Sequence, residues 1–160
     1  RLIFQAIRNL KLPRRLVGTV VEGGVYTMGT LHNLIIRNPK YDYRYVLAIL
    51  NSNLMNEYYA ATYPEHRIKG KYLEALPLRQ LNFESHEDMT AQRRIIELVD
   101  EMLRLNRSVV ETEDARTPTE ALAQLDAEID GIVYRLYGLT AEEVAIVEGT
   151  AVEEPLDTAE

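Results

Sequence analysis

The sequence predicts an α+β fold, in which a small, mainly antiparallel sheet with a packed helix is followed by an antiparallel helical hairpin and a short third helix. Three observations predict it. Short apolar runs separated by turn residues fill the first forty positions, as in strands. Apolar residues then recur at helical spacing. The charge is also divided, because residues 1–83 hold 12 Lys and Arg against 5 Asp and Glu, whereas residues 84–160 hold 6 against 20.

This division of charge predicts three regions. Net charges of +7 (12 minus 5) and −14 (6 minus 20) sum to the −7 of the whole chain. We expect a basic α/β part at residues 1–83, an acidic helical part at 84–149 and a disordered acidic tail at 150–160. The overall acidic balance therefore hides a part that is as basic as a nucleic-acid-binding module.

Two strands are predicted near the start of the chain, at residues 1–7 and 16–21. Both segments are rich in β-branched or bulky apolar residues. Pro13 lies between them and has no backbone N–H to donate to a ladder, so this connection is a turn or a sheet edge.

Two further strands are expected at residues 25–28 and 34–37. Gly23-Gly24 indicates a tight reversal before the first of them, because paired glycines tolerate the positive φ that hairpin turns require. The four segments together predict a partly antiparallel sheet.

One amphipathic helix is predicted to follow the sheet. Asp42 is suited to the N-cap, and Pro64 disfavours helical conformation at Tyr63, where the helix should end. The apolar positions at helical spacing are Tyr43, Val46, Leu47, Leu50, Leu54 and Tyr58. After this helix we expect an exposed basic loop at residues 65–71, and then a short return strand or an extended stretch at the edge of the sheet at 72–78.

Two long helices with matching apolar seams are predicted in the acidic part. The first covers residues 88–113, and the second begins at Thr117-Pro118-Thr119-Glu120, which combines an N-cap, a proline at the first helical position and a capping-box glutamate. Gly138 supplies the C-terminal stop, and Thr140 opens a third, short helix. The seam positions are Ile95, Val99, Met102, Asn106 and Val109 in the first helix, and Leu122, Leu125, Ile129, Ile132 and Leu136 in the second.

The connection of roughly seven residues favours a hairpin of these two helices within one chain over two independent coiled-coil strands. Asn106 is the polar member of the first seam. It either fixes the register of the pairing at some cost in stability, or it faces solvent near the end of its helix.

Several classes of catalytic site lack their motifs. His32, His66 and His86 lie far apart and there are no cysteines, so a metal site is not expected. The sequence has neither a GxxxxGK[ST] phosphate loop nor a GxSxG nucleophile turn.

Residues 38–41, Asn-Pro-Lys-Tyr, resemble the Asn-Pro-Pro-aromatic motif of adenine-N6 methyltransferases, but Lys40 replaces the second proline and no glycine-rich cofactor loop precedes it. All four lysines precede most of the acids, which also disfavours a metal-dependent nuclease. We expect no catalytic residue, metal or cofactor in this segment.

The remaining composition predicts a cytoplasmic protein. No apolar run is long enough to cross a membrane, no signal peptide is visible, and the lack of cysteine is compatible with a reducing compartment. The chain begins at Arg1 without a methionine and continues directly into an apolar stretch, which we interpret as the start of a fragment.

Cations and aromatic rings are concentrated in the basic part, which holds eight of the ten tyrosines. Guanidinium and ammonium groups at turns and element ends can reach phosphates, and guanidinium can also read guanine in the major groove. The candidate DNA-binding residues are Arg14, Arg15, Lys40, Arg44, Arg67, Lys69, Lys71, Tyr63 and Tyr72. For each single cation the alternative is ordinary surface solvation.

Three segments in order along the chain carry a resemblance to a known family. They are residues 45–54 (YVLAILNSNL), 67–77 (RIKGKYLEALP) and 129–140 (IDGIVYRLYGLT). With Leu12-Pro13-Arg14-Arg15, they resemble the TaqI-like C-terminal specificity domain, which is the target-recognition region of adenine-specific DNA methyltransferases and of type II restriction-modification enzymes. The resemblance covers nearly all of residues 12–149.

The resemblance implies that this region reads the DNA sequence, while an upstream methyltransferase domain of the parent binds S-adenosylmethionine and methylates adenine. The division of charge assigns the contact with double-stranded DNA to residues 1–83. The acidic hairpin should face away from DNA and brace the basic part against that domain or a partner subunit. Landmark residues such as Asn51 and Ser52 are expected to pack and cap helices. Two alternatives stay open: a protein-interaction module that uses the heptad helices, and the specificity subunit of a multi-subunit restriction-modification system. No membrane partner is expected.

Overall fold

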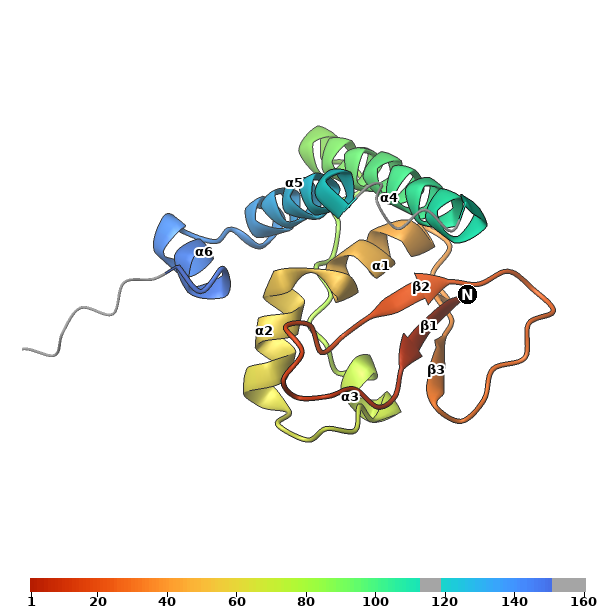
Figure 1. Cartoon of the computed structure of the whole chain (residues 1–160). Coiled ribbons are helices and arrows are strands. Elements are labelled where there is room, and N and C mark those ends of the chain that lie inside the picture. Colours follow the sequence, from red (N-terminus) through yellow and green to blue (C-terminus); the bar gives the residue numbers. More distant parts are fainter. Residues whose placement is uncertain (113–118, 151–160) are drawn as a thin grey trace, which may run out of the picture.

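The computed structural model describes residues 1–112 and 119–150. These residues form three strands and six helices, with the basic part below and the two longest helices above in Figure 1. In chain order the elements are β1 (Leu2–Gln5), β2 (Gly18–Val20), β3 (Leu31–Leu34), α1 (Tyr43–Asn51), α2 (Asn53–Thr62), α3 (Gly70–Glu74), α4 (His86–Thr112), α5 (Thr119–Tyr137) and α6 (Ala141–Val147).

The sheet is antiparallel, with the strand order β2-β1-β3. Its central strand buries Leu2 and Phe4, which alternate with more exposed residues as a half-buried strand requires. Phe4 pairs with Gly18 across the ladder, and a Cβ at Gly18 would lie only 2.5 Å from the Phe4 ring. A glycine is therefore needed there for the ring to pack against the neighbouring strand.

The two later strand predictions need correction. Residues 25–28 form part of a loop, because Val25, Tyr26 and Met28 are exposed and find no strand to pair with among the described residues. The turn before them is real, and Gly24 has a φ of +81°. The third strand is Leu31–Leu34, which overlaps the predicted segment only at its last residue.

The predicted single helix is in fact two helices that meet at Ser52. This residue has extended backbone dihedrals, with φ −60° and ψ 156°, and it serves as the C-cap of α1 and the N-cap of α2. Its hydroxyl donates to the Ile49 carbonyl and accepts from the Met55 N–H at 3.2 Å. The predicted ends of the pair are confirmed, since Asp42 caps α1 and Tyr63 ends α2.

The prediction of a return strand or extended stretch at residues 72–78 is wrong for its first half, because a helix occupies residues 72–74 and no strand is formed at 75–78. Helix α3 begins inside the predicted basic loop, and it buries Leu73 while Leu76 is buried just beyond it. A spacing of three residues between these leucines suits a helical turn rather than the alternation of a strand.

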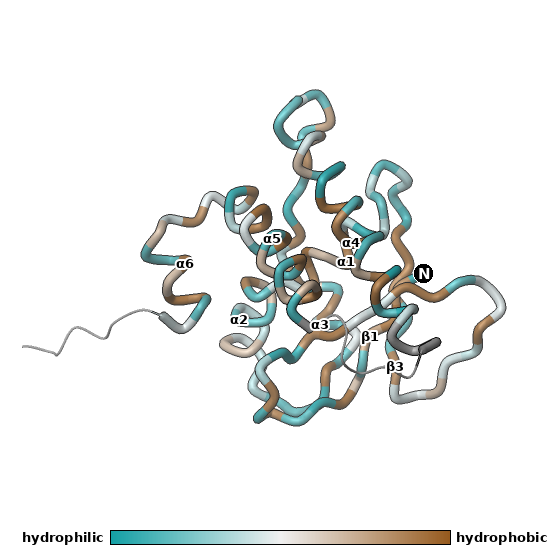
Figure 2. Tube along the Cα trace, turned by 45° about the horizontal axis from the view of Figure 1, so that its top comes forward, coloured by the Kyte–Doolittle hydropathy of each residue, from teal (hydrophilic) through white to brown (hydrophobic). Residues whose placement is uncertain are grey.

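Helices α4 and α5 form the predicted hairpin. The seam residues Ile95, Val99, Ile129 and Ile132 are buried, and Figure 2 shows hydrophilic and hydrophobic colours alternating along both helices, as expected for amphipathic ones. Asn106 is exposed and donates to the Met102 carbonyl of its own helix at 2.9 Å, so the solvent-facing alternative is correct.

The predicted capping residues near the ends of the hairpin lie only partly within the described residues. Gly138 has a φ of +70° after α5, and Thr140 forms a capping box with Glu143 at the start of α6, as predicted. The Val109 side chain, the Thr117-Pro118 cap and residues 151–160 of the predicted tail lie outside the described residues.

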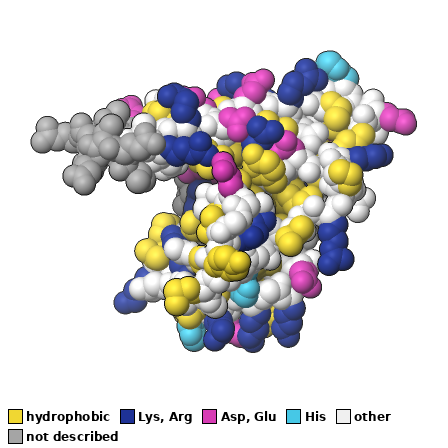
Figure 3. All heavy atoms as spheres, turned by 90° about the vertical axis from the view of Figure 1, so that its right-hand side faces the viewer, with side chains coloured by type: hydrophobic (Ala, Val, Ile, Leu, Met, Phe, Trp, Pro, Cys, Tyr) yellow, Lys and Arg dark blue, Asp and Glu magenta, His cyan; other side chains and the backbone are white. Residues whose placement is uncertain are grey.

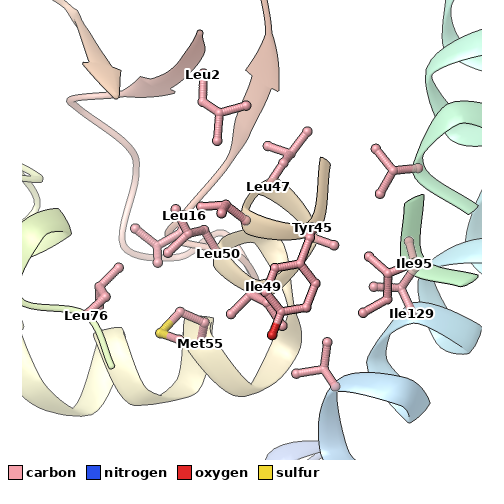
Figure 4. Close-up of a cluster of buried hydrophobic side chains, with 14 of the residues drawn as sticks. Leu2, Leu16, Tyr45, Leu47, Ile49, Leu50, Met55, Leu76, Ile95 and Ile129 are labelled. Atoms are coloured by element: carbon pink, nitrogen blue, oxygen red, sulfur yellow. The ribbon is translucent and has the colours of Figure 1, made fainter. Parts of the chain in front are cut away.

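Helix α1 lies at the centre of the core. All six residues from Tyr45 to Leu50 are buried. Figure 4 shows Leu2 and Leu16 on one side of this helix and Ile95 and Ile129 on the other. One hydrophobic cluster therefore joins the sheet to the hairpin through α1.

Candidate nucleic-acid interface

Three tyrosine rings form a continuous row at the end of α2. The Tyr59 and Tyr63 rings lie 5.1 Å apart, and Tyr63 is stacked on Tyr72 with ring centroids at 4.1 Å and an interplanar angle of 15°. The row exists because α2 ends at Tyr63 and the chain returns through residues 64–69 to α3, which carries Tyr72.

Cations lie along this row of rings. Lys69 and Lys71 each place their Nζ atom 5.3 Å from the centre of the Tyr72 ring, and the Arg15 guanidinium lies 5.9 Å from the Tyr59 ring centre. Both distances allow cation–π attraction. We refer to the six side chains and the neighbouring carboxylate as the cation–tyrosine cluster, which comprises Arg15, Tyr59, Tyr63, Glu65, Lys69, Lys71 and Tyr72.

Arg15 is unusual because it is a buried cation, with 5% of the residue exposed. One terminal nitrogen donates to the Glu65 carbonyl at 2.6 Å, while its Nε finds no partner in the described part of the chain. Its own backbone N–H donates to the side chain of Asn56, which also accepts from the Leu16 N–H. No carboxylate among the described residues pairs with this guanidinium, so it adds positive charge to the interior beside the row of rings.

Glu65 is the acid of the cluster. Its two carboxylate oxygens are used separately, with Oε2 at 2.6 Å from Lys69 Nζ and Oε1 accepting from the Tyr72 hydroxyl at 3.1 Å. The hydrogen bond from Lys69, followed by that from Tyr72, lowers the pKa of Glu65, and the Glu65 partner in turn raises the pKa of Lys69. All of these groups remain accessible to solvent.

The loop that carries these residues is tied to the sheet. Arg67 forms an isolated antiparallel bridge with Ile7. The next residue, Ile68, is fully buried, its N–H donates to the Ala6 carbonyl at 2.9 Å, and its carbonyl lies 2.6 Å from His32 Nε2. The expected exposed loop is therefore anchored at its middle, while Arg67 itself stays exposed and makes no ion pair with a described residue.

Two of the predicted cations lie elsewhere and are already paired. Arg14 contacts Asp126 at 3.1 Å and Asp130 at 3.6 Å, while Arg44 contacts Asp42 at 2.7 Å and Asp100 at 2.6 Å. Both arginines thus bridge the basic part to the acidic hairpin.

Burial raises the pKa of Asp130 to about 6, although its bond from the Asn53 N–H and the charge of Arg14 oppose this shift. Burial therefore disfavours the charged form of the Asp130 carboxyl. Lys40 is exposed, and its Nζ lies 5.4 Å from the Phe83 ring centre, away from the cluster.

The structure thus gathers Arg15, Tyr63, Lys69, Lys71 and Tyr72 from the predicted set, with Arg67 on the same loop. Sequence reasoning missed Tyr59 and Glu65. The spacing could have indicated both, because Tyr59 lies one helical turn before Tyr63, and Glu65 lies four residues before Lys69.

The acidic hairpin and the basic loop lie at opposite ends of the molecule. In Figure 1, α4 and α5 form the top, whereas α3 and the loop before it form the bottom. Figure 3 shows a row of mostly Lys and Arg side chains along the lower edge of one face, while acidic and basic side chains are mixed toward the upper edge. A polyanion could therefore approach the lower end without meeting the hairpin.

The described residues contain neither a group of side chains suited to a metal ion nor a helix suited to crossing a membrane. Within residues 1–112 and 119–150, no three His, Cys, Asp or Glu side chains are grouped so that they could hold a metal ion. None of the helices that the structure describes combines the length and apolar character needed to cross a membrane.

Comparison with known families places this site in context. Residues 6–78 match the model of the TaqI-like C-terminal specificity domain, which confirms for this segment the resemblance noted in the sequence. The matched segment contains the elements from β2 to α3 and the whole cation–tyrosine cluster, whereas β1 and the acidic hairpin lie outside it. Neither the curated proteins nor the solved structures gave a match.

Proposed function

We propose that this chain is the sequence-specific DNA-recognition module of a type II restriction-modification enzyme or an adenine-N6 DNA methyltransferase. The observation that carries the proposal is that the segment matching the specificity domain contains the cation–tyrosine cluster. The basic end of the molecule is the DNA-facing end, and the module binds without catalysing a reaction.

The cluster has the chemistry that backbone recognition requires. Lys69, Lys71 and the exposed Arg67 supply cations for phosphate oxygens, which give most of the affinity of such proteins and set their position on the duplex. The edge of the Tyr63–Tyr72 stack offers flat rings beside these cations. Base discrimination comes from side chains of the same loop, at about 1–3 kcal/mol for each good bidentate contact.

The remainder of the proposed enzyme lies outside this module. The S-adenosylmethionine site and the methyl transfer belong to a methyltransferase domain of the parent, and no residue of this chain is assigned to the cofactor. The ion pairs of Arg14 with Asp126 and of Arg44 with Asp100 hold the hairpin against the recognition part. The hairpin in turn offers a rigid support for the catalytic domain.

The structure gives less support to the protein-interaction alternative. That alternative uses the heptad faces as a binding surface, but Ile95, Val99, Ile129 and Ile132 are buried within this chain. The apolar seam is already occupied by the two helices and α1.

The proposal is tested by titrating the chain with a duplex of mixed sequence at several salt concentrations. We expect the logarithm of the binding constant to fall linearly with the logarithm of salt, with a slope of about −0.9 for each phosphate neutralised. The double variant Lys69→Gln/Lys71→Gln should bind more weakly and make the slope shallower by about 0.9 for each phosphate that it no longer neutralises.

The matched control is Arg93→Gln/Arg107→Gln, which removes two exposed cations from the acidic hairpin. This control should bind like the wild type if the basic end faces DNA. Absence of duplex binding at low salt, or an equal drop in affinity for the two double variants, would contradict the proposal.

A further inference from the structure

Within the cation–tyrosine cluster, the Glu65 carboxylate lies where an anionic ligand would be held. Two donors from different positions of the loop and α3, Lys69 Nζ and the Tyr72 hydroxyl, converge on its two oxygens. A phosphodiester, like a carboxylate, presents two oxygens that share one negative charge on one centre, and charge-assisted hydrogen bonds are the usual way to hold it. Lys69 Nζ and the Tyr72 hydroxyl thus form a small anion-binding site, and the Glu65 carboxylate occupies it.

The site is open to solvent. The Glu65 side chain is 47% exposed and the Lys69 side chain is 41% exposed. An ion pair between exposed groups adds little stability because both charges are well hydrated when apart. The carboxylate can therefore leave without a large cost, and an incoming phosphate can reach the same donors.

The surrounding charge favours an external anion. Four cations lie in or beside the cluster: Arg15, Arg67, Lys69 and Lys71. Among the described residues, one of them is in an ion pair with a carboxylate, namely Lys69 with Glu65. Four cations against one acid leave a local excess of three positive charges. A phosphate would be held there even after Glu65 has turned away.

The backbone around Glu65 supports a movement of the side chain alone. Its carbonyl accepts from the buried Arg15 guanidinium, and three residues later Ile68 is tied to Ala6. These bonds fix the main chain of the loop at both positions. Rotation of the Glu65 side chain toward solvent therefore suffices to free the two donors.

We infer that Lys69 and Tyr72 form a phosphodiester site that Glu65 occupies in the free protein, and that a DNA phosphate displaces the carboxylate on binding. This inference rests on the proposed function and adds a built-in competitor to it. Non-specific contact is weakened, because every phosphate that reaches these donors must first displace an acid of the protein.

The direct test follows the Glu65 carboxyl carbon by ¹³C NMR across pH, with its signal assigned through Glu65→Gln. In the free chain the pKa of Glu65 should lie below the ordinary value, as the Lys69 and Tyr72 bonds dictate. With saturating duplex the same pKa should rise to or above the ordinary value, since the donors are then on phosphate and the DNA charge disfavours the carboxylate. A carboxyl whose titration is unchanged by bound duplex would overturn the inference.

The affinity of variants gives a second readout. Glu65→Gln should bind a mixed-sequence duplex up to about fivefold more tightly than wild type at low salt, the equivalent of removing one exposed ion pair. Glu57→Gln removes the same charge from an exposed position of α2 and should change the affinity less. Equal effects of the two variants would also overturn the inference. If the duplex binds but Glu65 is unaffected, the displacement alone fails, whereas a chain that binds no duplex contradicts the proposed function.

Discussion

At the scale of single residues, the positions of Arg14 and Arg44 depend on acids far away in the chain. Arg14 is held by Asp126 and Arg44 by Asp100, partners that are separated by 112 and 56 positions. Side-chain spacing in the sequence carries no information about such pairs. Arg15 and Arg14 are adjacent and chemically identical, yet one lies beside the row of tyrosines and the other braces the hairpin.

Asp130 gives the first prediction at this scale, and it concerns stability against pH. Its pKa is about 6 in the folded chain, against 3.8 for an unperturbed aspartate, chiefly because it is buried. Between these two values the folded state binds more protons than the unfolded state, so this group makes the free energy of unfolding fall as pH rises from about 4 to about 6. The difference in the free energy of unfolding across this window is on the order of 3 kcal/mol.

The measurement compares urea unfolding of wild type and Asp130→Asn at several pH values. The amide retains an oxygen for the Asn53 N–H but does not titrate. We expect the wild type to lose stability relative to the variant as pH rises through that window. Parallel stability profiles for the two proteins would show that burying the charge of Asp130 costs little.

At the scale of elements, the sequence pattern located the long helices but not the break between α1 and α2. The apolar spacing continues through Ser52, so periodicity alone predicts one helix. The break results from the hydroxyl, which bonds the backbone on both sides, and from Asn51, whose side chain bonds both the N–H and the carbonyl of Gly18. The expectation that these two residues pack and cap is confirmed.

Ser52→Ala should destabilise the protein by about 1–2 kcal/mol, because the Met55 N–H loses its cap and the Ile49 carbonyl loses a donor. Thermal or urea unfolding would measure the change. Thr62→Ala, at an exposed position near the end of the same helix, is the control and should stay within about 0.5 kcal/mol. A variant as stable as the wild type would mean that tertiary packing alone holds the break.

The strands show why short elements were harder to predict. Residues 25–28 have the composition of a strand, but a strand also needs a neighbouring edge, and β3 at Leu31–Leu34 takes the free edge of β1. Amino-acid composition does not reveal which of two nearby segments pairs with that edge of β1. The helical hairpin was predictable because its two seams recur over many turns.

At the scale of the whole molecule, the charge division does not coincide with a division of the core. Helix α1 belongs to the basic part by charge, yet it packs against both the sheet and α4. Buried residues from Leu2 to Val133 belong to one cluster. The basic and acidic parts therefore differ in their surface charge but share one hydrophobic core.

From this shared core we predict a single cooperative unfolding transition. Near-UV circular dichroism reports mainly on the basic part, which holds eight of the ten tyrosines, and far-UV circular dichroism reports mainly on the helices. The two signals should give the same midpoint on heating. Separate midpoints would show that the two parts unfold independently and would favour the boundary near residue 83 as a domain boundary.

The anchoring of Ile68 bears on how fast and how tightly the basic loop can engage a partner. Because Ala6 and His32 hold this residue in place, the backbone on either side is already ordered before anything binds. Ordering a flexible loop on association reduces affinity, whereas a loop ordered during folding avoids that reduction. The neighbouring cations and rings thus form a stiff surface on a sheet, and recognition at this end is a docking of two preformed shapes rather than a coupled folding event.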